Sequence, residues 1–304
     1  MSAVDQTGAA LATPRAKKKH GWQRGLRETW WRHAVAIIAI LFALFPVAYV
    51  ASGAFSAVPS LSAAKLIPDD LTLHNFGILF HEPATNYARW YANTMIIAAC
   101  VSLLTVLLGA LAAYAFSRFR FKGRRMGLLS LLLIQMFPQL LLIVAIYLIV
   151  LQTGKVFGVL GLNTLTGLIV VYLGGAMGVN TWLLKGFFDT IPAELDESAR
   201  VDGATPAQVF WGVVLPLATP VLAVIALFSF IGVVNEFVIA SVLLQNNEKF
   251  TLALGLRSFI DQQYSEHWGP FAAGVLLTAP PVVLLFLFLQ RFIVAGLTGG
   301  AVKG

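Results

Sequence analysis

The chain has 304 residues, of which 58% are hydrophobic and only 12% charged, and its mean hydropathy is +0.81. Soluble domains carry about 25% charged residues, so this composition excludes an ordinary soluble domain. The net charge of +7 is explained by basic residues that flank membrane spans and face anionic lipid, and we expect no nucleic-acid partner. The single cysteine, Cys100, excludes an intrachain disulfide.

Residues 1–30 are polar and basic, and we predict that they form a flexible cytoplasmic arm. The arm ends at Trp30 and Trp31, aromatic residues that suit a membrane interface. A cleaved signal peptide is the alternative for the first apolar run. The basic stretch before that run is too long for a signal, so we expect an uncleaved first helix in a membrane domain of residues 31–304.

Six stretches without Asp, Glu, Lys or Arg are long enough to cross a bilayer as helices. Their continuous apolarity argues against barrel strands, which alternate in polarity. The predicted fold is therefore an all-α integral membrane protein with six transmembrane helices. The predicted spans are about 33–55, 91–117, 126–151, 164–186, 207–235 and 269–293.

Lysine and arginine predict the orientation of these spans. If the N-terminus is cytoplasmic and the spans alternate, 16 of the 21 basic residues fall on the inside and 5 on the outside. By the positive-inside rule, both termini and the polar segment before the fifth span are then cytoplasmic. This is a multi-pass topology in a plasma membrane.

Uncharged polar side chains within the spans are candidates for a pathway that a polar solute follows. They are Gln135, Tyr147, Tyr172, Asn180 and Asn235. The alternative is that they form hydrogen bonds between helices. Glu236, at the outer end of the fifth span, is interpreted either as a gate or as an ordinary interfacial acid.

A polar insert, residues 187–206, separates the fourth and fifth spans. Pro192 suits a first helical turn, and Glu194, Asp196 and Glu197 then place negative charge where the helix dipole favours it. Gly203 can adopt the left-handed conformation that ends a helix. Thr205-Pro206-Ala207-Gln208 has the pattern of a capping box that begins a second helix, which continues into the fifth span.

The longest outer connection is residues 236–266. Its apolar run, 237–244, is too short to span a membrane, so we expect a re-entrant or interfacial segment. Long loops in compact proteins are often functional. Candidate contacts with an external solute-binding protein are Gln245, Asn246, Asn247 and Asp261, and the alternative is a solvated loop packed on neighbouring helices.

No cluster of metal ligands and no phosphate-binding loop is visible in the sequence, so we expect a chain without catalytic, cofactor-binding or metal-binding residues. Ion-coupled transporters and membrane enzymes place ionisable residues inside their spans, whereas the central parts of these six spans have none. Both classes remain as disfavoured alternatives.

The polar insert also carries a family resemblance. The spacing of Glu197-Ser198-Ala199, Gly203, Val213 and Leu215-Pro216 resembles the cytoplasmic signature loop of ABC importer membrane subunits. Ser198 and Val213 depart from the usual alanine and isoleucine. Further similarity at 135–138, 172–175, 202–206 and 290–304 resembles the smaller, six-span (G-type) permease of maltose-type importers.

The resemblance implies a type I ABC importer permease fold in a bacterial inner membrane. It implies a second permease subunit, two ATPase subunits that bind ATP and Mg²⁺, and an extracytoplasmic sugar-binding protein. Maltose or maltodextrin is the expected solute, with trehalose or another sugar or polyol as the alternative. The residues that it assigns to coupling with the ATPase are Glu194, Glu197, Ser198, Ala199, Asp202, Gly203 and Pro216.

Overall fold

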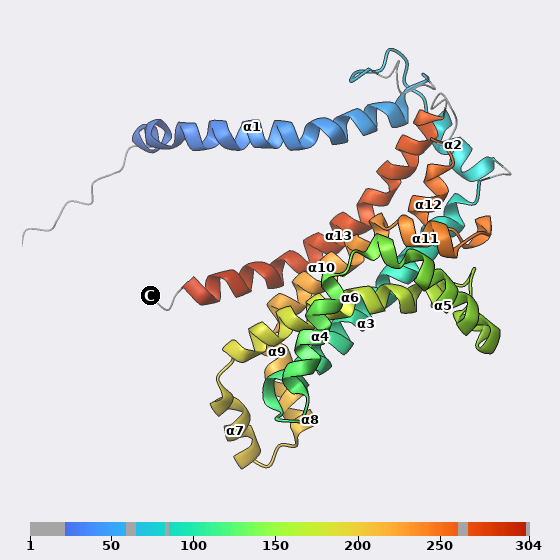
Figure 1. Cartoon of the computed structure of the whole chain (residues 1–304). Helices are drawn as coiled ribbons and strands as arrows, with labels where there is room; N and C mark the ends of the chain where they lie inside the picture. The colour runs from blue at the N-terminus through green and yellow to red at the C-terminus, as the bar shows by residue number, and fades with distance from the viewer. Residues whose placement is uncertain (1–21, 59–64, 83–84, 261–266, 302–304) are drawn as a thin grey trace, which may run out of the picture. The chain divides into compact units, whose positions relative to one another are not determined.

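The computed structural model describes residues 22–58, 65–82, 85–260 and 267–301, and these residues are almost entirely helical (Figure 1). The longer helices are α1 (Trp22–Phe55), α2 (His74–His81), α3 (Tyr87–Arg118), α4 (Arg124–Met136), α5 (Ile143–Val156), α6 (Leu165–Thr190), α7 (Ala193–Val201), α10 (Thr219–Asn235) and α13 (Trp268–Ala301). The shorter ones are α8 (Pro206–Val209), α9 (Leu215–Leu217), α11 (Val238–Leu243) and α12 (Leu252–Arg257). Within the described ranges the only β-type pairing is the isolated bridge Ser56–Leu71.

Four of the described helices are long and apolar enough to cross a membrane, namely α1, α3, α6 and α13. Two bent pairs, α4 with α5 and the stretch Pro206–Leu217 with α10, each have the composition of one further span. The described chain thus offers up to six spans, in the order that apolarity predicts.

The N-terminal helix begins at Trp22, inside the stretch that we predicted to be a flexible arm. The chain divides into two compact units, residues 1–48 and 49–304, and α1 runs through the boundary. In the first unit the side chains from Trp30 to Val47 are largely exposed, and Phe42 is 83% exposed. A helix that is apolar on all sides needs lipid or another protein around it.

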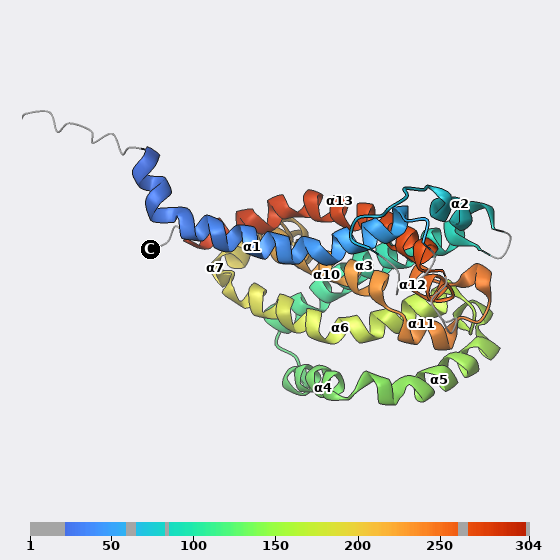
Figure 2. The ribbon, with the colours of Figure 1, turned by 90° about the horizontal axis from the view of Figure 1, so that it is seen from above.

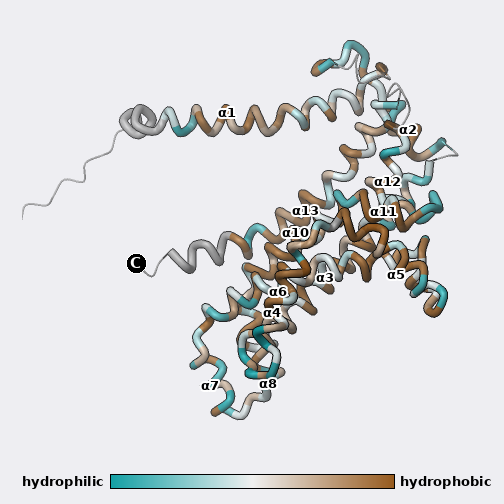
Figure 3. Tube along the Cα trace, viewed as in Figure 1, coloured by the Kyte–Doolittle hydropathy of each residue, from teal (hydrophilic) through white to brown (hydrophobic). Residues whose placement is uncertain are grey.

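The second unit is built around three helices, α3, α6 and α10, which pack along one another. α13 lies against α10 on one side, and α4 lies against α6 on the other (Figure 2). Buried apolar side chains fill the interfaces in separate clusters along the bundle, the largest of which includes Ile97, Leu168 and Phe230. Figure 3 shows that hydrophobic residues dominate α10, whereas hydrophilic residues gather around α7 and α8.

The third predicted span, 126–151, is not the continuous helix that we expected. Helix α4 ends at Met136, and α4 and the helical stretch after Pro138 lie 88° apart. The local cause is Pro138: proline disfavours the helical region for the residue before it, and Phe137 is extended, with φ −76° and ψ 130°.

The fifth predicted span, 207–235, is also bent, by 77° between Leu217 and Thr219. A π-helical turn, Phe210–Val214, precedes Pro216, which has no N–H to donate. Pro220 likewise has no N–H for the carbonyl of Pro216. That carbonyl instead accepts a backbone N–H at the end of α9 and the Thr219 hydroxyl, the latter at 2.7 Å. The bend is therefore an elbow at which the Pro216 carbonyl keeps its hydrogen bonds.

Candidate coupling segment and membrane pocket

The polar insert folds as the sequence predicts, into a helix, a glycine stop and a capped second helix. Pro192 precedes α7, and Glu194 and Asp196 lie in the first turn of that helix. Gly203 has φ +86°, a conformation that glycine adopts without steric cost. The Thr205 hydroxyl accepts from the Gln208 N–H, and the Gln208 side chain accepts from the Thr205 N–H, which completes the capping box.

The end of α7 has the two hydrogen bonds of a Schellman motif. The N–H of Ala204 donates to the carbonyl of Ala199 at 2.9 Å, and the N–H of Gly203 donates to the carbonyl of Arg200 at 3.0 Å. This pairing fixes the last turn and sends the chain off in a new direction. Helix α7 therefore ends at a defined place, and the chain restarts in α8 after only a few residues.

A buried ion pair joins α7 to the end of α3. The carboxylate of Asp196 lies 2.9 Å from Nε of Arg118, and both side chains are at most 10% exposed. Arg118 also donates from Nη2 to the carbonyl of Ile191, at 2.9 Å. Arg118 thus contacts both the chain just before α7 and the helix itself. The sequence does not reveal this pair, because no local pattern connects two residues 78 positions apart.

The other face of α7 is open. Glu194, Glu197 and Ser198 are exposed, and Val201 is 88% exposed. Ala199 is half-buried and packs against the apolar cluster that contains Phe188 and Val209. Asp202, Gly203 and Pro216, which the resemblance also assigns to coupling, are exposed. The insert thus presents acidic, hydroxyl and apolar side chains on a short helix whose inner face is anchored.

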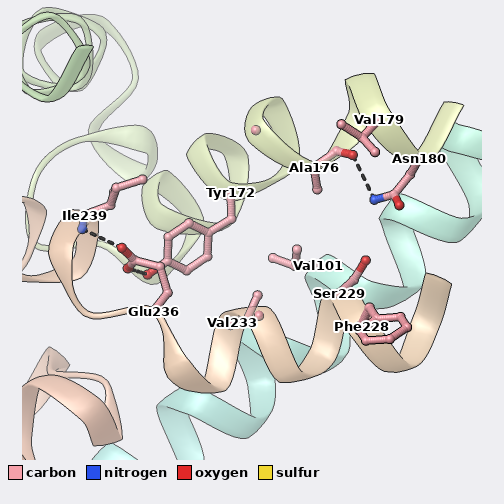
Figure 4. A pocket seen from close by; sticks show the side chains of 12 residues that line it. Val101, Tyr172, Ala176, Val179, Asn180, Phe228, Ser229, Val233, Glu236 and Ile239 are labelled. Atoms are coloured by element: carbon pink, nitrogen blue, oxygen red, sulfur yellow. Dashed lines mark hydrogen bonds between the residues drawn. The ribbon is translucent and has the colours of Figure 1, made fainter. Parts of the chain in front are cut away.

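A cavity of about 370 Å³ lies between α3, α6 and α10 (Figure 4). It brings together two of the predicted pathway residues, Tyr172 and Asn180, with Glu236 and with Ser229, which the sequence analysis did not single out. The Tyr172 hydroxyl donates to the Glu236 carboxylate. That carboxylate also accepts the N–H groups of Ile239 and Ala240, at 2.7 and 3.1 Å.

Glu236 therefore caps the N-terminus of α11, because its carboxylate accepts hydrogen bonds from the free N–H groups there. The Asn180 amide donates to the carbonyl of Ala176 on its own helix, which leaves the amide oxygen without a hydrogen bond to another described residue. The cavity wall is otherwise mainly apolar, and it includes Val101, Val179 and Phe228. Hydroxyl, amide and carboxylate groups on an apolar wall are what a polyhydroxylated solute needs.

The remaining pathway candidates lie elsewhere. Gln135 donates to the carbonyl of Gly175 at 2.8 Å and lines a separate cavity between α4, α5 and α6. Tyr147 packs half-buried against the central cluster. Asn235 bonds the carbonyl of Ile231 and faces the side of α10 toward α12. Gln135 thus forms the hydrogen bond between helices that was the alternative interpretation, whereas Asn235 bonds within its own helix, α10.

The outer connection is folded, with α11 as a short helix in the apolar core. Asn163, which has φ +60°, accepts the N–H groups of Gln245 and Asn246 at 2.5 and 2.9 Å. The indole of Trp90 donates to the backbone carbonyl of Asn247 at 2.8 Å. Gln245 and Asn246 are exposed, and the predicted contact Asp261 lies outside the described residues.

The chain is similar to known proteins in both sequence and fold. Residues 105–298 match the family described as binding-protein-dependent transport system inner membrane component. The chain is 40% identical over 261 residues to the maltodextrin transport system permease protein MdxG of Bacillus subtilis (86% of this chain, 91% of the relative). It is 39% identical to the maltose/maltodextrin permease protein MalG of Vibrio vulnificus (92% and 98%).

Among solved structures, the chain resembles a subunit of a bacterial ABC transporter involved in the import of the acidic polysaccharide alginate. The TM-score is 0.70 at 26% identity, over 88% of this chain and 97% of that chain. These matches confirm the resemblance to G-type sugar permeases and the type I importer permease fold. The chain belongs to the family of binding-protein-dependent transport system inner membrane components.

Proposed function

We propose that this permease subunit serves an ATP-driven importer of maltose, maltodextrin or a related oligosaccharide. The relatives named for maltodextrin and maltose support this solute class, because the chain covers more than nine-tenths of each of them. A relative named for galactooligosaccharides, at 36% identity, supports the wider class of oligosaccharides. Trehalose, or another sugar or a polyol, remains the second candidate.

The partners that we propose are a second permease subunit, two ATPase subunits and an extracytoplasmic sugar-binding protein. The family description and the solved alginate importer, one structure of which is a complex with a periplasmic protein, support partners of this kind. ATP and Mg²⁺ are bound by the ATPase subunits. Both termini and the polar insert lie in the cytoplasm, in keeping with the excess of basic residues at these ends.

The observation that carries the mechanism is the anchored helix α7. Its exposed face offers Glu194, Glu197 and Ser198 to an ATPase subunit, while the Asp196–Arg118 pair ties its inner face to α3. When ATP closes the two ATPase subunits, α7 moves and carries α3, α6 and the elbow before α10 with it. The cavity between α3, α6 and α10 then changes shape, which gives alternating access. Such coupling requires a difference in affinity between the two states.

ATP hydrolysis by the complex in proteoliposomes tests this function. We expect loaded maltose- or maltodextrin-binding protein to stimulate hydrolysis, and Glu197→Arg to abolish co-purification of the ATPase in detergent. Glu82→Arg, which reverses another exposed acid at the end of α2, is the matched control and retains the ATPase. Stimulation by trehalose alone would favour the second candidate. An unchanged Glu197→Arg complex would contradict the role of α7.

A further inference from the structure

A cationic pocket lies at the ends of α4 and α6, apart from the cavity described above. Its lining includes Arg124 and Arg125 in the first turn of α4 and Lys185 near the end of α6, with a volume of about 580 Å³. Trp182, one turn before Lys185, forms part of the wall and donates from its indole to the carbonyl of Leu128 at 3.3 Å. The two helices are therefore held together around this pocket.

One acid that interacts with these cations is Asp189. It pairs with Lys185 and accepts a hydrogen bond from Ser117 at 2.7 Å. One carboxylate offsets one of three cations, so the lining keeps a net positive charge. Neither arginine forms a salt bridge with another residue that the structure describes. The charge of Arg124 acts on Asp189 more weakly than that of Lys185 does, and Arg125 is exposed.

The lining changes character along the helix axes. The cations lie at the helix ends, whereas Met126, Leu129 and Trp182 follow toward the middle of the spans and are 68%, 43% and 39% exposed. A rim of cations above an indole and exposed apolar side chains has the polarity gradient of a phospholipid at a membrane surface. A free phosphate would use only the rim and would leave the apolar part uncovered.

We propose that this pocket binds the headgroup of one anionic phospholipid, with Arg124 and Arg125 on the phosphate and the upper acyl chains against Met126, Leu129 and Trp182. Guanidinium groups suit phosphate oxygens because their N–H groups form a planar fork. The proposal rests on the pocket alone and does not depend on the transported solute. Lipid at this place contacts α6 only a few residues before the polar insert begins.

Native mass spectrometry of the purified complex tests the proposal, with phosphatidylglycerol as the probe and phosphatidylcholine as the neutral comparison. We expect Arg124→Gln with Arg125→Gln to reduce retained phosphatidylglycerol about thirtyfold, or about fivefold for each arginine. The matched control is Arg120→Gln with Lys122→Gln, which removes the same charge from the segment just before α4 but from outside the pocket lining. The control retains the lipid.

Equal loss in both double variants would overturn the proposal, because it would show a general surface attraction. If inorganic phosphate displaced the retained lipid and protected the complex as well as the lipid does, the pocket would be a phosphate site instead. A photo-crosslinker in place of Met126 distinguishes phospholipid from a partner subunit as the occupant of the pocket. Capture of phospholipid supports the proposal, and capture of a partner subunit alone contradicts it. None of these readouts requires transport activity.

Discussion

Arg118 shows how one residue holds a functional helix. It is the last residue of α3, yet its guanidinium reaches both the carbonyl of Ile191 and the carboxylate of Asp196. A buried pair of this kind adds little stability relative to apolar residues of the same volume. Removing only one partner, however, leaves a charge without compensation. The pair thus makes the position of α7 sensitive to single substitutions and tolerant of a matched double one.

We expect Asp196→Ala to destabilise the docking of α7 by roughly 3–5 kcal/mol, because Arg118 stays buried without its partner. The double variant Asp196→Leu with Arg118→Met should recover most of this loss. Limited proteolysis of the segment 191–206 in the purified complex measures the effect as a faster cleavage rate. If the double variant is cleaved as fast as the single one, packing rather than charge controls the docking.

At the scale of elements, the structure differs from the sequence prediction where the backbone turns. The apolar runs predicted six spans, and the glycine, capping and acidic patterns predicted the polar insert. Apolarity does not predict the elbow in the fifth span or the break at Pro138, since a proline permits a bend but its size depends on the packing around it. For the outer connection the sequence left open a re-entrant or interfacial segment and a solvated loop packed on neighbouring helices, and it did not reveal that Asn163 and Trp90 bond this connection to α3 and to the segment just before α6.

Asn163 gives an element-scale prediction because it combines a left-handed backbone with an acceptor for two N–H groups. Asn163→Asp keeps both features and should resemble the parent chain. Asn163→Gly keeps only the backbone, and Asn163→Ala keeps neither, so each step should cost about 1 kcal/mol. Hydrogen exchange at the Gln245 and Asn246 amides measures this order. Equal exchange in the glycine and alanine variants would refute the backbone contribution.

At the scale of the whole molecule, the distribution of apolar surface points to a chain made for assembly. Val35 to Val47 of α1 expose apolar side chains on all sides, and the described part of residues 49–304 packs its own core around α3, α6 and α10. Composition predicted membrane insertion and the number of spans. Which side chains meet across the bundle, such as Tyr172 and Glu236, could not be predicted because such contacts depend on how distant helices rotate against each other.

The single cysteine makes the orientation testable. Cys100 is half-buried within α3, so Cys100→Ser provides a background without accessible thiols. In that background Lys155→Cys should react with a membrane-impermeant maleimide in intact spheroplasts, whereas Lys122→Cys should react only in inverted vesicles. Both lysines are exposed, which matches the two probes. The reverse labelling pattern would place the polar insert outside the cell.

The hydroxyl of Thr219 has a consequence for biogenesis. An unsatisfied carbonyl within lipid costs several kcal/mol, and at this elbow the Pro216 carbonyl accepts both a backbone N–H at the end of α9 and the Thr219 hydroxyl. The groups that bond the Pro216 carbonyl therefore lie in the same span and are present when the span leaves the translocon. The carbonyl at the bend is thus satisfied from within the same span before any other subunit has bound, whereas the size of the bend depends on the packing around it.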